Sequence, residues 1–185
     1  MDKTAREVPG DTIVYIHLPG VTYEGSLVIG ERSINLYGGE EGKTVFTGGI
    51  QVTQELGNIC YFDGLEIWGS GEGIGISASA RVHLTNCKIS DWRTGLLAYG
   101  NTWVNATDCV FEDDQVGFHF NAAGATVTHT TYRGNTFRRN GTAVLLESVP
   151  ADAGLRFPDC LFSGNGVDID NRCGRELDIS RAGFE

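Results

Sequence analysis

The sequence predicts an all-β solenoid, in which short parallel strands follow one another around successive coils. Three observations lead to this fold class. A four-residue unit ending in an apolar anchor recurs at intervals of 22, 22, 26 and 25 residues, with anchors at Ile67, Ile89, Phe111, Phe137 and Phe162. Short alternating apolar segments separate these units, bounded by turns rich in Gly, Asn and Asp. No stretch shows a helical period, and self-similarity at this length is the signature of a solenoid.

The first part of the chain holds short apolar segments interrupted by glycine. Strands are expected at 11–16, 27–29, 33–37, 44–47 and 50–52. These strands are close together and less regularly spaced than those that follow. Because a solenoid needs its first coil covered, we expect residues 1–57 to form an N-terminal cap and an irregular first coil.

Five regular coils are expected over residues 58–172. In every coil the second strand places its first core residue seven positions after the anchor, so equivalent strands should stack in register. The extra residues of the longer repeats fall at 121–129 and 147–154, where a loop can bulge without disturbing the stack. The repeat is lost after residue 172, and we expect 173–185 to form a C-terminal cap of what is a single domain overall.

Stacking in register should place equivalent residues in internal columns. One such column holds Cys87, Cys109, Asn135 and Cys160. Their spacing does not suit a zinc site, so we expect reduced, buried thiols that pack as small hydrophobic groups, with disulfides as the alternative. We expect the Asn135 amide, which stands where a cysteine would be, to bond backbone groups of the turn.

The coils follow the pattern n-C/N-x-I/F-x-x-N-x-x-G-I/V, which resembles the repeats of the pectate-lyase-like superfamily. The segments T-I-V-Y-I-H-L-P-G-V-T-Y and S-I-N-L-Y-G are also similar to the first turns of that superfamily. The resemblance covers nearly the whole chain. It implies a right-handed single-stranded parallel β-helix with three strands per coil, about six coils and short capping segments. It matches no specific enzyme family, so no catalytic residue is carried over from it.

The formal net charge of −10 argues against non-specific binding to nucleic acid or an anionic membrane, because both need a basic surface. It also disfavours a polyanionic substrate unless a cation mediates. No apolar run is long enough for a transmembrane helix, and residues 1–7 lack the apolar stretch of a signal peptide. The localisation stays open: cytoplasmic, or extracellular if the chain is a fragment of a secreted protein.

Candidate catalytic residues lie at outward positions of the second strand in the last coils, where polar side chains gather. Glu147 and Asp170 would be diagonal neighbours, about 7–8 Å apart at Cβ. That separation suits the acid and base of an inverting glycosidase, which must admit a water between them. His119 would share a column with Asp170, about 9–10 Å away, with Leu145 between them. We therefore select Glu147, Asp170 and His119.

Candidate substrate-binding residues on the same surface are Tyr99, Asn121, Asp168 and Arg172. Tyr99 could stack on a sugar ring, and Asn121 is expected directly beside Glu147, where it could orient a sugar hydroxyl. Structural interpretations compete with these roles. Arg172 would lie opposite Glu147 and form an ion pair with it, and Asp168 with Asp170 could serve only to solubilise the last coil.

Two further groups have alternative readings. Glu112-Asp113-Asp114 could bind Ca²⁺, but no metal-binding motif surrounds it, so a solvated turn competes and neither a metal nor another cofactor is predicted. The three tryptophans could form an exposed aromatic edge for sugar or pack turns together. They are Trp68, Trp92 and Trp103.

Three functions remain open at this point. The first is a glycan-binding or accessory domain, part of a larger protein, which holds a polysaccharide along its outer sheet. The second is a small polysaccharide-active enzyme, a glycoside hydrolase or lyase, acting on the same face. The third is a structural or protein-interaction module. The predicted partner is thus a polysaccharide or other glycan, without nucleic acid or membrane, and the oligomeric state is open.

Overall fold

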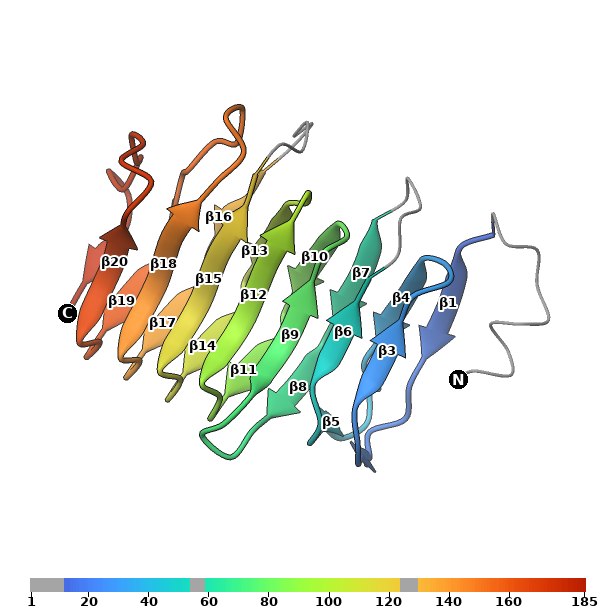
Figure 1. Ribbon diagram of the computed structural model, residues 1–185. Coiled ribbons are helices and arrows are strands. Elements are labelled where there is room, and N and C mark those ends of the chain that lie inside the picture. Colours follow the sequence, from blue (N-terminus) through green and yellow to red (C-terminus); the bar gives the residue numbers. More distant parts are fainter. Residues whose placement is uncertain (1–11, 54–58, 124–129) are drawn as a thin grey trace.

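The computed structural model describes residues 12–53, 59–123 and 130–185. Within these ranges the chain contains no helix and winds into a parallel β-helix of about seven coils, one more than the predicted six (Figure 1). Consequently, no helix long and apolar enough to cross a membrane occurs among the described residues. Each coil contributes strands to three parallel sheets, here called A, B and C.

The strands of the three sheets follow one another in chain order. Sheet A contains β1 (Val14–His17), β4 (Ile34–Tyr37), β7 (Cys60–Asp63), β10 (Val82–Thr85), β13 (Val104–Thr107) and β16 (Tyr132–Arg133). Sheet B contains β2 (Thr22–Tyr23), β5 (Thr44–Phe46), β8 (Leu65–Trp68), β11 (Lys88–Ser90), β14 (Val110–Glu112), β17 (Thr136–Arg138), β19 (Leu161–Ser163) and β21 (Gly183–Phe184). Sheet C contains β3 (Leu27–Ile29), β6 (Ile50–Val52), β9 (Ile74–Ala78), β12 (Thr94–Gly100), β15 (Val116–Ala122), β18 (Thr142–Ser148) and β20 (Val167–Asn171).

Both ends of the chain take part in these sheets. Residues 12–53, which we expected to form a cap and an irregular first coil, supply the first two strands of each sheet. At the other end β21, within the expected C-terminal cap, pairs with β19 and extends sheet B. Residues 1–11 and 54–57 of the expected N-terminal segment lie outside the described residues, as does 124–129 of the expected loop insertion.

The turns explain why Gly, Asn and Asp recur in the repeat. The residue that opens each four-residue unit has a left-handed backbone, with φ between 50° and 67°, at Gly64, Asn86, Asp108, Gly134 and Asp159. Gly, Asn and Asp tolerate this conformation better than other residues. A second left-handed position follows two residues after the anchor, at Asp91, Asp113, Arg139 and Gly164. The first turn leads from sheet A to sheet B and the second leads from sheet B to sheet C.

The predicted columns form the core. The anchors pair in register from Phe46 through Phe162, and all of them are buried. Phe137 stacks between Phe111 and Phe162, with ring centroids 4.9 and 5.0 Å away. Such pairs of aromatic rings stabilise a core beyond the area that they bury.

The cysteine column also agrees with the sequence. Cys87, Cys109 and Cys160 are buried free thiols, and none forms a disulfide. Asn135 accepts a hydrogen bond from the Cys109 N–H at 2.9 Å and donates to the Ala106 carbonyl at 2.9 Å. The expected role of this buried amide is therefore confirmed.

Candidate functional site

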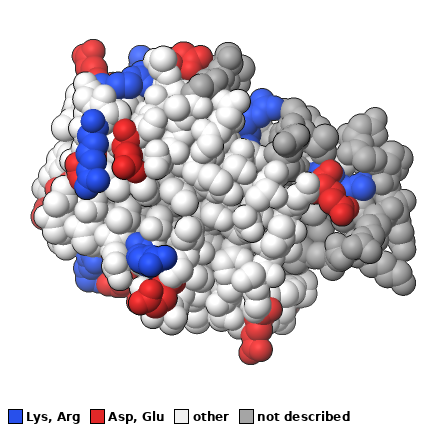
Figure 2. Space-filling view, in the orientation of Figure 1, with Lys and Arg blue, Asp and Glu red and all other residues white. Residues whose placement is uncertain are grey.

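The outer face of sheet C lies toward the viewer in Figure 1, and Figure 2 shows the same view with its charges. The view is largely uncharged, and most acidic and basic side chains lie near its edges. Pairing in register places one outward residue from each strand of sheet C in a single column, which runs through Val28, Gln51, Ser77, Leu97, His119, Leu145 and Asp170. The predicted alignment of His119, Leu145 and Asp170 is confirmed.

Glu147 leaves this regular pattern through a β-bulge. The pairing of β15 with β18 passes from Phe120–Leu146 directly to Asn121–Ser148, so Glu147 is an extra residue in β18. Its carboxylate reaches His119, whose Nε2 lies 2.9 Å from Glu147 Oε2. Two expectations were therefore wrong. Asn121 is aligned with Ser148 rather than Glu147, and the partner of Glu147 is His119 rather than Arg172.

The two remaining candidate acids have different environments. Arg172 Nη2 lies 2.8 Å from Asp170 Oδ2, so the partner of Arg172, which directly follows β20, is Asp170 on that strand. Asp168 is half-buried near the start of β20, where it accepts a hydrogen bond from Asn165 Nδ2 at 3.0 Å. Asp168 therefore lies on β20 like Asp170, but its carboxylate is bonded to a residue of the preceding turn.

The structure brings together three small groups on sheet C. Tyr99 and Asn121 are aligned on adjacent strands, Tyr99 half-exposed and Asn121 exposed. His119 and Glu147 form the second group. Asp170 and Arg172 form the third. A ligand along this face would meet hydrogen-bonding groups, one aromatic ring and charges that are already paired.

Sheet A has an aromatic outer surface that our sequence reasoning did not find. It consists of Tyr15, His17, Tyr37, Tyr61 and His83. The rings stack on one another, with centroids 5.0–6.4 Å apart and planes within 25°. Because stacking occupies ring faces, this surface offers few free faces for a sugar. The sequence did contain a signal for this surface. In the first strand of a coil, aromatic residues alternate with buried ones, as Tyr61 does between Cys60 and Phe62.

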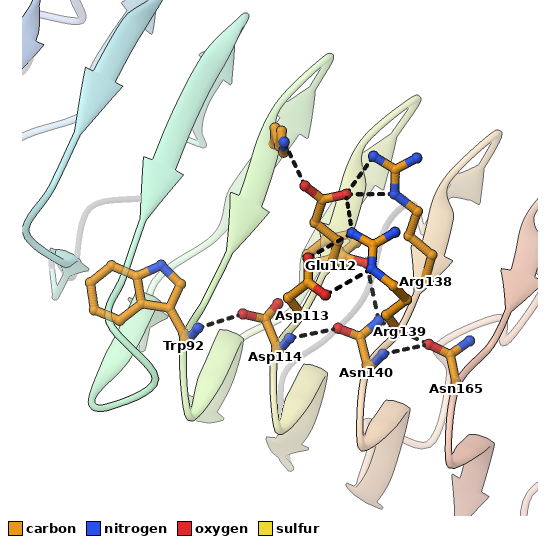
Figure 3. Close-up of polar contacts among 10 residues, drawn as sticks. Trp92, Glu112, Asp113, Asp114, Arg138, Arg139, Asn140 and Asn165 are labelled. Carbon is orange, nitrogen blue, oxygen red and sulfur yellow. Dashed lines mark hydrogen bonds and ion pairs between the residues drawn. The ribbon is translucent and has the colours of Figure 1, made fainter.

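The acidic turn is not a solvated turn, as Figure 3 shows. Glu112 is buried and lies within ion-pair distance of Lys88, at 2.5 Å, and of Arg138. Burial acts to raise the pKa of Glu112, but the hydrogen bonds and charges of Lys88 and Arg138 outweigh it and lower that pKa. Asp113 is paired with Arg139 at 2.6 Å, and the hydrogen bond from Arg139 lowers the pKa of Asp113.

These ion pairs disfavour Ca²⁺ binding at the turn, because cationic side chains already bind the carboxylates of Glu112 and Asp113. In the part of the chain that the structure describes, no group of three or more His, Cys, Asp or Glu side chains is arranged to hold a metal ion.

The tryptophans divide into two kinds. Trp92 and Trp103 are buried, so they form no exposed edge. Trp68 on sheet B is 39% exposed and donates a hydrogen bond from Nε1 to Glu66 Oε2 at 2.9 Å. Lys43 Nζ lies 6.0 Å from its ring centroid. Charged neighbours therefore surround this single exposed indole.

Comparison with known proteins identifies the fold but no individual relative. The family model described as the right-handed beta helix region matches residues 45–181. No curated protein and no solved structure matches the chain.

Proposed function

This chain belongs to the family of right-handed β-helix proteins, and from that premise we propose that it binds a neutral glycan along the outer face of sheet C. The observation that supports this most is the composition of the face. Tyr99, Asn121 and His119 lie on two adjacent strands, and Leu97, two residues before Tyr99 on β12, is aligned with His119 on the same surface. Sugars combine apolar ring faces with hydroxyl groups, and this surface offers partners for both.

The charges of the face favour a neutral ligand over an acidic one. Glu147 is bonded to His119, and Asp170 is bonded to Arg172. His119 and Arg172 are therefore already paired and are poorly placed to bind the carboxylate or sulfate groups of an acidic glycan. The net charge of −10 would also repel a polyanion. Parallel strands repeat about every 4.8 Å, so a chain of sugars lying across them would meet equivalent groups from successive coils.

An enzyme is the second candidate, and the His119–Glu147 contact is what favours it. A carboxylate that holds an imidazole can fix its tautomer for proton transfer. Catalysis would need a second group, and Asp170 is two strands away in the same column with Leu145 between. Because Arg172 already binds Asp170, we favour binding without turnover, as in an accessory domain.

The test is retention on immobilised polysaccharides, both neutral and acidic, followed by affinity measurement with the best soluble fragment. We expect retention on at least one neutral polysaccharide, and about tenfold weaker binding for Tyr99→Ala and for His119→Ala, which corresponds to about 1.4 kcal/mol each. Tyr61→Ala, which removes an exposed ring from sheet A, is the matched control and should bind normally. Retention by acidic polymers alone, or equal loss in the control, would refute the proposal.

The same samples separate binding from turnover. An enzyme would release new reducing ends or unsaturated products from the retained polysaccharide, and Glu147→Gln would abolish that release. A binding domain would leave the polymer intact over prolonged incubation while still retaining it.

A further inference from the structure

A second ladder of side chains runs through the turns between sheets B and C. It is formed by the residue three positions after each of the last four anchors, from Ile89 to Phe162; these residues are Trp92, Asp114, Asn140 and Asn165 (Figure 3). Each rung after Trp92 accepts a hydrogen bond from the backbone N–H of the rung before it. Asp114 accepts from Trp92 at 2.8 Å, Asn140 accepts from Asp114 at 3.0 Å, and Asn165 accepts from Asn140 at 2.9 Å.

Three of these rungs also donate a hydrogen bond to the anchor carbonyl of the preceding coil. Asn165 Nδ2 donates to the Phe137 carbonyl at 3.0 Å, and Asn140 Nδ2 donates to the Phe111 carbonyl at 3.0 Å. The Trp92 indole does the same with Nε1, which lies 3.1 Å from the Ile67 carbonyl. The remaining anchor in the series is Ile89, and the rung that corresponds to it is Asp114.

Asp114 Oδ2 stands where the other rungs have a donor nitrogen. A Cβ placed on Gly75 would lie 3.0 Å from Trp92 Nε1, and one on Gly117 would lie 3.4 Å from Asn140 Nδ2. A Cβ on Gly95, the equivalent glycine between them, would lie 2.6 Å from Asp114 Oδ2. Asp114 is only 3% exposed, and Oδ2 has no hydrogen-bond partner. If Asp114 were ionised, its buried Oδ2 would carry negative charge without a hydrogen-bond donor, at the position from which the other rungs donate to an anchor carbonyl. Burying such a charge is unfavourable.

We propose that Asp114 keeps its carboxyl proton in the folded protein at neutral pH and donates it from Oδ2 to the Ile89 carbonyl, completing the ladder as an asparagine would. Loss of this proton in alkaline solution removes the donor and leaves a buried charge between two coils. We therefore expect the contact between the coils of β11 and β14 to become less stable as pH rises from about 4 to about 8.

The charged groups around Asp114 support the protonated form. Glu112, Asp113 and Asp91 all place negative charge near it. The nearby cations are Lys88, Arg138 and Arg139, and their contacts are with Glu112 and Asp113. Burial, opposed by the bond from the Trp92 N–H and reinforced by these acids, raises the pKa of Asp114 to about 8.

The sign of the resulting pH dependence follows from proton binding. An aspartate in the unfolded chain has a pKa of about 3.9. Between that value and the folded value of about 8, the folded protein holds one more proton than the unfolded chain at this residue. The contribution of Asp114 to stability is thus fully present below pH 4 and decreases as pH rises, by about tenfold in the folding equilibrium constant per pH unit. Above about pH 8 it changes no further.

The experiment compares urea unfolding of the wild type, Asp114→Asn and Asp113→Asn between pH 5 and pH 9. Asp114→Asn supplies the donor permanently. We expect its folding equilibrium constant, relative to wild type, to increase about tenfold per pH unit up to about pH 8 and then to level off. Asp113→Asn removes a neighbouring acid whose own pKa is lowered, so its difference from wild type should stay nearly constant between pH 5 and pH 7, where Asp114→Asn already changes steeply.

A difference between Asp114→Asn and wild type that does not vary with pH would overturn the proposal, as would a variant less stable than wild type at pH 7. Carboxyl ¹³C NMR of the wild type provides an independent measurement that needs no variant to fold. The Asp114 carboxyl signal should titrate near pH 8. Titration near or below pH 4 would show that the folded protein holds Asp114 ionised.

Discussion

Replacing Phe137 with alanine removes the central ring of the anchor column. The side chain is 1% exposed and stacks on Phe111 and Phe162 at 4.9 and 5.0 Å. Truncating a buried phenylalanine costs about 3–5 kcal/mol, and two stacks are lost here rather than one. We therefore expect a loss near the upper end of that range, about 4–5 kcal/mol of unfolding free energy.

Phe184→Ala is the matched control at the end of the same column. Phe184 stacks only on Phe162, at 5.0 Å, and is 46% exposed, so its truncation should cost about 1–2 kcal/mol. Urea unfolding followed by tryptophan fluorescence measures both variants against wild type at a fixed pH. A loss below about 1 kcal/mol for Phe137→Ala, or equal losses for the two variants, would show that the column does not stack in this register.

Two further substitutions examine the polar part of the interior. Asn140→Ala should cost about 2–4 kcal/mol in urea unfolding, because it leaves the Asp114 N–H and the Phe111 carbonyl buried without partners; a loss below 1 kcal/mol would contradict the ladder. Glu112→Gln should lower stability at pH 7, where Lys88 and Arg138 bind the carboxylate. Because the pKa of Glu112 is lowered on folding, this contribution is present above the unfolded value of about 4.3 and is lost as pH falls through the folded value. The difference from wild type should therefore narrow in acid, and a constant difference would refute the assignment.

The repeat allowed much of the fold to be predicted, because a constant offset from the anchor determines which side chains stack. The alignment of His119, Leu145 and Asp170 followed from it directly. The partner of Glu147 did not, since a one-residue bulge adds a residue without leaving a distinct sequence pattern. The longer repeat shows only that extra residues exist somewhere after Leu146.

The acidic turn was misread because its three neighbours in sequence occupy three different environments. Glu112 ends a strand of sheet B, Asp113 takes the left-handed position, and Asp114 turns inward. A signal was nevertheless available. The repeat has asparagine three positions after the anchor at Asn140 and Asn165. An aspartate at the equivalent position can donate the same hydrogen bond only if its carboxyl group is protonated.

Mapping a bound glycan by amide NMR tests most directly whether sheet C is the functional face. The protein would be titrated with a soluble fragment of the best-retained neutral polysaccharide. We predict that shift changes gather on β12, β15 and β18, around Tyr99, His119 and Asn121. Changes that gather instead on the aromatic surface of sheet A, around Tyr15, Tyr37 and Tyr61, would contradict this assignment.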